Sequence, residues 1–146
     1  MTISRNPEDD IQQAEWEVLT GDPELTALVT GVWDEVPEDA ARPYVRIGDR
    51  LSIPDNDHGG FGREITETVH VWTEGRGNRE GQRIVARVVA LLDHQPAALN
   101  QRLATMDSPH RVISVRHEFG QQLRDPDPTV RHAVARFRII TTQEES

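Results

Sequence analysis

Residues 129–142 read TVRHAVARFRIITT, a segment in which apolar and polar side chains alternate. The alternating apolar positions are Ala133, Ala135, Phe137 and Ile139, and His132, Arg136 and Arg138 lie between or beside them. Because successive side chains of a strand point to opposite faces, this period of two predicts a β-strand with one face in the core.

The preceding segment, 111–124, carries a second strand pattern and is joined to the first by residues 125–128, DPDP. Proline and aspartate in such a cluster are typical of a turn, so the two segments predict an antiparallel hairpin. We expect Ile113, Val115 and Phe119 to face the same side as the apolar residues of the last strand.

Charge selects between the registers that this hairpin allows. One register places Glu118 opposite Arg136, where opposite charges attract. A register shifted by two residues places Arg116 opposite Arg136, and like charges directly opposite each other are unfavourable. We therefore predict the register that pairs Glu118 with Arg136.

Two earlier segments also have strand patterns. The first, 43–53, ends before Pro54. It has four apolar residues at odd positions, which lie on one face of a regular strand: Val45, Ile47, Leu51 and Ile53. The second, from about residue 64 to 73, has Ile65, Val69 and Val71 on one face. Between them, residues 54–62 form a loop that nothing in its own sequence is expected to order.

Three segments have helical periodicity. They cover about residues 7–20, 23–29 and 78–93, with capping residues expected at Asn6 and Asn78 and the second helix starting at Asp22-Pro23-Glu24. After Pro96 the pattern weakens until Arg111. The expected order is α-α-β-β-α-β-β, an α+β fold with an antiparallel sheet of about four main strands and flanking helices. We expect a single domain, 1–146, with an acidic N-terminal helix at about 7–20 and a core at about 23–142.

Composition excludes several classes of protein. The 146 residues contain no cysteine, which excludes disulfides, thiolate metal sites and a cysteine nucleophile. No apolar run approaches the roughly 20 residues of a membrane-spanning helix. The N-terminus lacks the basic and apolar regions of a signal peptide, so we expect a protein made in the cytoplasm without a membrane partner.

Acidic residues are concentrated near the N-terminus. The chain has 16 basic residues, all arginine, against 25 acidic ones, for a net charge of −9. Residues 1–41 hold 11 acids and one arginine, a net charge of −10. A protein with this net negative charge repels a phosphate backbone, so we do not expect the surface as a whole to bind nucleic acid.

Four kinds of functional site can be tested against the sequence, and each lacks at least one residue that it requires. Gly75, Gly77 and Gly81 follow a predicted strand, as in a dinucleotide-binding turn, but Glu80 occupies the position of the third glycine. A calcium loop starting at Asp55 would need a carboxylate where Thr66 stands. The six histidines show no ligand spacing, and no serine lies in a nucleophile motif. We expect no catalytic residue, no cofactor and no metal, and hence no enzyme.

Four short motifs resemble a known family. Residues 42–48, RPYVRIG, look like the Pro-Tyr strand of the tail-completion, or tail terminator, proteins of long-tailed phages and gene transfer agents. The stretch 69–92, VHVW and the following turn and helix, is similar to that family's central block. Residues 124–138 resemble its ending, and 21–32 its lead-in. The likeness covers about residues 14–142 in the right order.

The resemblance implies an assembly role in a virion. Members of this family form a six-fold ring that caps the head-proximal end of the tail tube in siphophages, ends its growth and is then joined to the head. The implied partners are other copies of the chain, the tail tube protein and a head-side connector, with DNA passing the lumen without specific binding. Such a protein assembles in the host cytoplasm. The alternatives are a head-completion or neck protein, and a small-molecule-binding α+β domain that uses the turn 75–81.

Exposed turns are the candidates for partner contact. In the loop 54–62 they are Asp57, His58, Gly59, Gly60 and Phe61, and at the hairpin tip they are Asp125, Asp127 and Arg131. Glycine-rich and tip segments often become ordered against a partner. We also expect some of the acids of 1–41 to face the channel, where they would repel DNA and let it slide.

Overall fold

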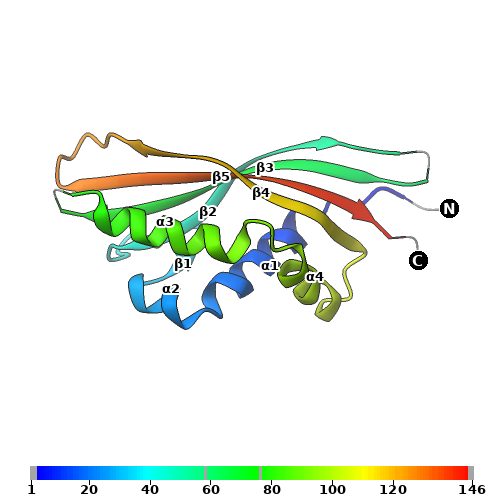
Figure 1. Cartoon of the computed structure of the whole chain (residues 1–146), viewed down its shortest axis with the longest axis horizontal. Helices are drawn as coiled ribbons and strands as arrows, with labels where there is room; N and C mark the ends of the chain where they lie inside the picture. The colour runs from blue at the N-terminus through cyan, green and yellow to red at the C-terminus, as the bar shows by residue number, and fades with distance from the viewer. Residues whose placement is uncertain (1–2, 58, 76, 145–146) are drawn as a thin grey trace.

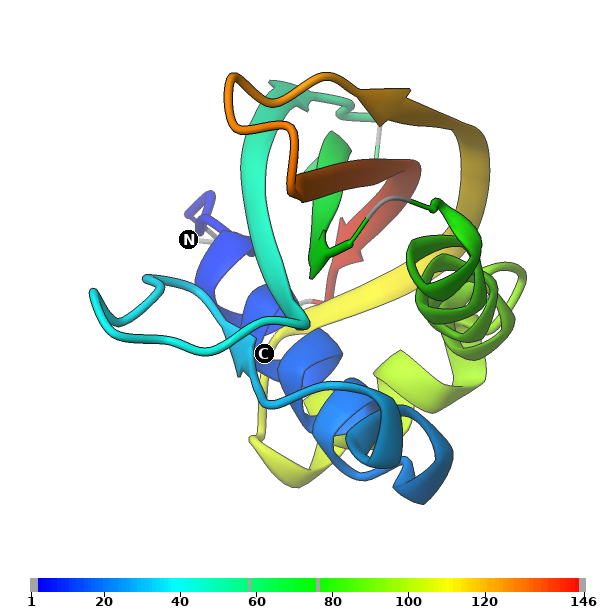
Figure 2. The ribbon, with the colours of Figure 1, turned by 90° about the vertical axis from the view of Figure 1, so that its left-hand side faces the viewer.

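The computed structural model describes residues 3–57, 59–75 and 77–144, and it shows one long twisted sheet with helices packed beneath it (Figure 1). The elements in chain order are α1 (Glu8–Thr20), α2 (Pro23–Leu28), β1 (Val32–Trp33), β2 (Tyr44–Pro54), β3 (Gly62–Glu74), α3 (Arg79–Leu92), α4 (Pro96–Thr105), β4 (His110–Leu123) and β5 (Val130–Gln143). Seen from the end of the sheet, the helices lie on one side and the strands arch over them (Figure 2).

The sheet has the order β1-β2-β3-β5-β4. The four long strands are antiparallel to their neighbours, whereas β1 runs parallel to the start of β2. The α+β fold is confirmed, but the sheet is mixed and has five strands, because the two-residue β1 is too short to give a pattern. The sequence also missed α4, whose buried contacts come from only two residues, Leu99 and Leu103.

The core lies between the helices and one face of the sheet. Alternate residues of β3 and β5 supply that face, as the period of two predicts. α1 and α3 cover it with apolar stripes at helical spacing. The fully buried side chains include Ile11, Leu19, Ile65, Val69, Ile84, Val88, Phe137 and Ile139.

A β-bulge in β2 overturns part of the predicted pattern. The register shifts between Gly48 and Arg50, and the extra residue, Asp49, has a φ of +50°. Past this point the strand reverses its two faces. Leu51 and Ile53, which we predicted to lie in the core, are therefore 63% and 46% exposed on the opposite face.

The same reversal turns Arg50 toward the helices. Its Nε donates to Glu67 of β3 at 2.9 Å, its Nη1 donates to Gln12 of α1, and its Nη2 lies 3.9 Å from Glu15 of α1. Both glutamates are buried. Burial and the charge of Glu67 raise the pKa of Glu15 well above its usual range, although Arg50 opposes this. One arginine thus holds α1 on the sheet between two carboxyl groups.

Two further bulges displace the predicted hairpin register. The register of β4 against β5 shifts after Val112 and again after His117. Glu118 lies in the second bulge, so Phe119 rather than Glu118 stands opposite Arg136. The predicted attraction is nevertheless present, because the Glu118 carboxylate lies 3.5 Å from Arg136 and also contacts a second arginine of β5, Arg138.

The bulges also change which residues of β4 are buried. Ile113 and Phe119, predicted to face the core, are 55% and 43% exposed, whereas Val115 is buried as predicted. Val112 takes the buried place expected for Ile113. The alternating pattern therefore predicted correctly that this segment forms a strand. It predicted which side chains are buried only for the part of the strand between the two bulges.

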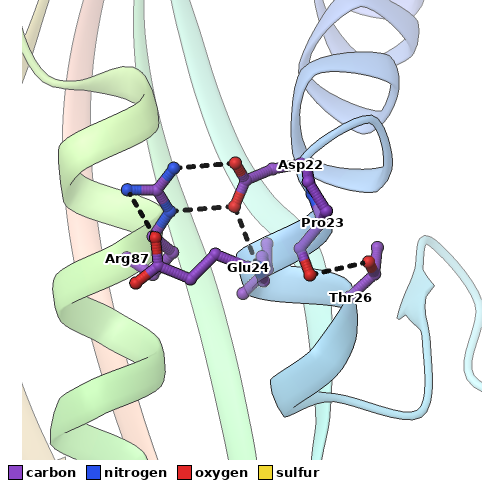
Figure 3. A network of polar contacts seen from close by, with 6 residues as sticks. Asp22, Pro23, Glu24, Thr26 and Arg87 are labelled. Atoms are coloured by element: carbon purple, nitrogen blue, oxygen red, sulfur yellow. Dashed lines mark hydrogen bonds and ion pairs between the residues drawn. The ribbon is translucent and has the colours of Figure 1, made fainter.

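An ion pair joins α2 to α3 (Figure 3). Asp22 caps α2 by accepting from the backbone N–H of Leu25 at 2.8 Å, and the same carboxylate accepts from Nε and Nη2 of Arg87 at 2.8 and 2.7 Å. These hydrogen bonds from Arg87 lower the pKa of Asp22. Asp22 therefore serves both as the cap of α2 and as an interhelical contact.

We expect Glu15→Gln to stabilise the fold increasingly as the pH rises. The pKa of Glu15 is raised in the folded protein, so its stabilising contribution is complete below the ordinary value of 4.5 and is lost as the pH rises through the folded value. Glutamine keeps the neutral form at every pH. Urea unfolding of both proteins from about pH 5 to about pH 9 measures the difference. Glu17→Gln on the same helix is the control, and a difference independent of pH would contradict the assignment.

Candidate assembly surfaces

The two turns predicted to contact partners lie at opposite ends of the sheet (Figure 1). The β2–β3 turn lies at the end where the chain termini are found, and the β4–β5 tip lies at the other end, next to the start of α3. The structure therefore does not bring the two candidate groups together. It separates them along the long axis of the molecule.

The described residues of the β2–β3 turn are joined by hydrogen bonds from their own side chains, contrary to our expectation. Asp57 and Gly60 form a bridge, with Asp57 N–H donating to the Gly60 carbonyl at 3.1 Å. Asp57 Oδ1 accepts from Gly59 N–H at 2.8 Å, and Asn56 Oδ1 accepts from Gly62 N–H at 3.1 Å. These are aspartate and asparagine turn contacts that composition alone did not reveal. The candidate His58 lies outside the described residues.

Phe61, the aromatic candidate of this turn, is half-buried. Its carbonyl accepts from the backbone N–H of Gln143 at 2.8 Å, and the Gln143 side chain in turn contacts the backbone of Ile3 and Arg5. Phe61 therefore lies where the turn meets both termini of the described chain, and the residue is only partly buried.

The acids of the β4–β5 tip shape the turn. Asp125 Oδ1 accepts from Asp127 N–H at 3.0 Å, and Asp127 Oδ1 accepts from the N–H and the hydroxyl of Thr129 at 2.9 and 2.8 Å. The Thr129 hydrogen bonds lower the pKa of Asp127. Arg131 is half-buried on β5, just past the tip. The exposed tip is thus preformed, as a surface for rigid docking would need.

A chain of polar side chains crosses the sheet face away from the helices. The Asp49 carboxylate contacts Nε2 of His70 at 2.7 Å, and Nδ1 of His70 contacts Nε2 of His132 at 2.7 Å. His132 stacks on Trp72 with the ring centroids 3.6 Å apart. Burial, followed by the charge of His70, lowers the pKa of His132 to about 4. The chain links β2, β3 and β5.

The third strand histidine lies on the other face. His117 of β4 packs against Phe137 with ring centroids 5.4 Å apart. His70, His117 and His132 therefore all lie on sheet faces, but they do not share one face. Among the described residues no group of three or more His, Asp and Glu is arranged to hold a metal ion.

The turn 75–81, compared above with a dinucleotide site, connects β3 to α3. Gly75 has a φ of +112°, and a Cβ atom added at Gly81 would lie 3.9 Å from the side chains of Thr73 and Ala133. Asn78 occupies the predicted cap position, but its side chain makes no capping hydrogen bond. Arg76 lies outside the described residues. No helix of the described chain is long and apolar enough to cross a membrane.

The sequence did not predict the grooves and exposed apolar side chains that lie along the edge strands of the sheet. A groove of about 690 Å³ lies beside β2, between α1 and the residues that follow β1. A second groove, of about 420 Å³, runs between α3 and the far half of β4. Leu51, Ile53 and Phe119 are exposed on these edge strands, and only the bulges, which alternation does not show, put them there.

Comparison with known proteins identifies relatives of this fold. The family model described as "Tail completion protein gp17" matches residues 16–142. A chain in the virion of a native gene transfer agent particle is 22% identical with a TM-score of 0.80, over 95% of this chain and 99% of that one. Bacteriophage SPP1 gp17 is 24% identical with a TM-score of 0.52, over 90% and 88%. No curated protein matches the sequence.

We expect His132→Gln to reduce the loss of stability on mild acidification. Because the folded pKa of His132 is lowered to about 4, the unfolded chain takes up a proton first, and stability falls as the pH drops from 6.5 toward 4. Thermal unfolding across this range measures the slope. The matched control is His94→Gln, since His94 is exposed. Equal slopes for wild type and His132→Gln would contradict this interpretation.

Proposed function

Because the chain belongs to the tail completion protein gp17 family, we propose that it forms a ring on the head-proximal end of a phage-type tail tube. The ring ends tube growth and provides the surface that is joined to the head. A structural role in the tail follows from the family itself, whereas the capping position and the six-fold ring are the proposal. The proposed role involves no catalysis.

The observation that carries this proposal is the separation of two preformed turns by one continuous sheet. The β2–β3 turn and the β4–β5 tip lie at opposite ends of the long axis (Figure 1). A protein that joins two partners needs two contact surfaces held at a fixed distance, and a hydrogen-bonded sheet provides that rigidity. We propose that one end contacts the tail tube protein and the other a head-side connector.

The whole chain acts as one domain in this proposal. Residues of α1, including Ile11, Ala14 and Leu19, share one apolar cluster with residues of β3, β5 and α3. The acids of 1–41 are carried by α1, α2 and the segment after β1, and all of them except the buried Glu15 are at least partly exposed. Some of them face the lumen of the ring in this proposal, where they repel DNA and leave it unbound. The protein assembles in the host cytoplasm and remains in the virion.

Deletion of the gene, followed by electron microscopy of the particles, tests this function. We expect headless tails of abnormal and variable length, because the tube would lack the ring that stops its growth. Complementation with the wild-type gene is the control and restores tails of one length. Tails of normal length beside filled, tail-less heads would assign the protein to the neck instead, and normal particles would overturn a structural role in assembly.

We expect Phe61→Ala to lower the yield of joined particles in that complementation test. The aromatic ring would be lost from the β2–β3 turn, while the backbone contact to Gln143 would remain. Tyr44→Ala is the control, a half-buried aromatic residue at the start of β2. If Phe61→Ala lowers the melting temperature of the protein and leaves assembly intact, Phe61 belongs to the fold and not to the contact.

A further inference from the structure

The outer edge of β2 is covered over only part of its length. β1 pairs with Val45 and Arg46, and within the described residues no strand pairs with this edge farther along. Ile47 lines the groove that begins where β1 ends. The uncovered part of β2 is therefore Ile47–Pro54. Unpaired strand edges offer backbone groups to another chain.

The outer edge of β4 is also half covered. The Asn100 side chain accepts from Val112 N–H at 2.7 Å and donates to its carbonyl at 2.9 Å. The N–H of His94 donates to the Val115 carbonyl at 2.8 Å, and Asp93 accepts from His117 N–H at 2.8 Å. These contacts occupy the edge as far as the second bulge. From Phe119 to Leu123 the described residues pair with β5 alone.

We propose that Glu118–Arg124 of one copy pairs with Ile47–Pro54 of the next copy and so continues the sheet around the ring. This inference rests on the proposed function, since it names the contact by which copies meet. β2 and β4 run in opposite directions because the four long strands alternate. A rotation about the ring axis keeps the direction of each strand along that axis, so when the strands run along the axis the seam between copies is antiparallel. The two edges are different surfaces, which is the condition for a head-to-tail ring.

The lengths of the two uncovered segments fix a register. The seven residues Ile47–Ile53 include one bulge residue, Asp49, which leaves six positions in the ladder. On β4 the bulge residue Glu118 is left out in the same way, so Phe119–Arg124 also supplies six positions. When Ile53 stands opposite Phe119, Ile47 stands opposite Arg124, and Pro54 and Glu118 lie beside each other at the end of the seam.

The side chains agree with this register on the exposed face. Phe119 and Ile53 stand directly opposite each other, with Leu51 one step along, and all three are exposed in the single copy. Paired residues on one face of a sheet have their Cβ atoms about 5 Å apart. The seam would therefore cover the apolar side chains that the bulges expose.

The charges agree at the other end of the seam. Arg124 is exposed just past the end of β4, and in this register it lies beside Ile47 of the neighbouring copy. The groove at Ile47 is lined by three acidic residues, Asp9, Asp34 and Glu35. An arginine placed there meets charge of the opposite sign.

Backbone direction gives a further check. The N–H of Val45 donates to the carbonyl of Gly31, just before β1, at 3.1 Å. This hydrogen bond shows which residues of β2 direct their backbone N–H and C=O groups toward the outer edge. Past the bulge, Arg50 and Ser52 direct their backbone groups outward. On β4, Gly120 and Gln122 do so past the second bulge. The register pairs these two residues of each strand with one another.

Cysteine cross-linking in assembled particles tests the seam, since the chain has no cysteine of its own. We expect Ile53→Cys/Phe119→Cys to give, on oxidation, a ladder of cross-linked species that ends at the closed ring. The control is Ile53→Cys/Ile113→Cys, because Ile113 is equally exposed on β4 but lies in the covered half. We expect no ladder from that pair.

Particles that contain the first variant but give no ladder would overturn the seam, as would equal ladders from both pairs. Tail lengths of the same particles keep this outcome separate from the proposed function. Tails of uniform length without a ladder would refute the seam alone. A ladder together with a deletion that leaves tails normal would refute the capping role alone.

We expect Arg124→Glu to weaken ring formation about two- to fivefold, the range for an exposed ion pair, and more at low salt. Glu35→Arg in the same chain restores part of the loss, because the pair is then reversed. Arg111→Glu on the covered half of β4 is the control. Analytical ultracentrifugation over a concentration series measures the change, and an equal effect of Arg111→Glu would contradict the register.

Discussion

One extra residue in β2, Asp49, determines how both faces of the sheet are used. Its φ of +50° is a conformation that aspartate tolerates better than most residues, and the bulge it forms reverses the strand. On the inner face this brings Arg50 to Glu15 and Glu67. On the outer face the Asp49 carboxylate contacts His70 and so begins the chain that ends at Trp72. Helix attachment and the outer polar chain both depend on this one backbone feature.

The buried cluster around Arg50 specifies an arrangement more than it adds stability. Removing two carboxyl groups and a guanidinium from water is costly, and apolar residues of similar volume are often as stable in such places. Ion pairs, however, have a defined geometry. Arg50 reaches Glu67 on β3 and Glu15 on α1 only when the helix lies in one position along the sheet. The raised pKa of Glu15 means that one acid of the cluster readily holds a proton, which lowers the cost of placing two acids beside one arginine.

Elements that are specified by a long local pattern were predicted correctly from the sequence, whereas features that depend on contacts between residues distant in the chain were missed. Long strands such as 129–142 repeat the same signal many times, so their existence and inner faces could be predicted from alternation. β1 has two residues and α4 two buried leucines, too few for a pattern. The bulges at Asp49, Ile113 and Glu118 depend on contacts with partners distant in the chain. Sequence reasoning therefore found the turns at the sheet ends and missed the edges, because Leu51, Ile53 and Phe119 become exposed only through bulges.

Partial covering of the edges would let copies of the chain pair as we propose without pairing with other extended chains. A strand edge left open over its full length pairs with any extended chain and in several registers. Here β1 covers one end of β2, and Asn100, His94 and Asp93 cover one half of β4. These contacts limit where a neighbouring strand can pair. A strand shifted by two residues would lose backbone hydrogen bonds at one end and, at the other end, would lie against backbone groups that are already paired. Two such limits on two different edges thus define a single register, and a single register repeated from copy to copy is what a closed ring requires.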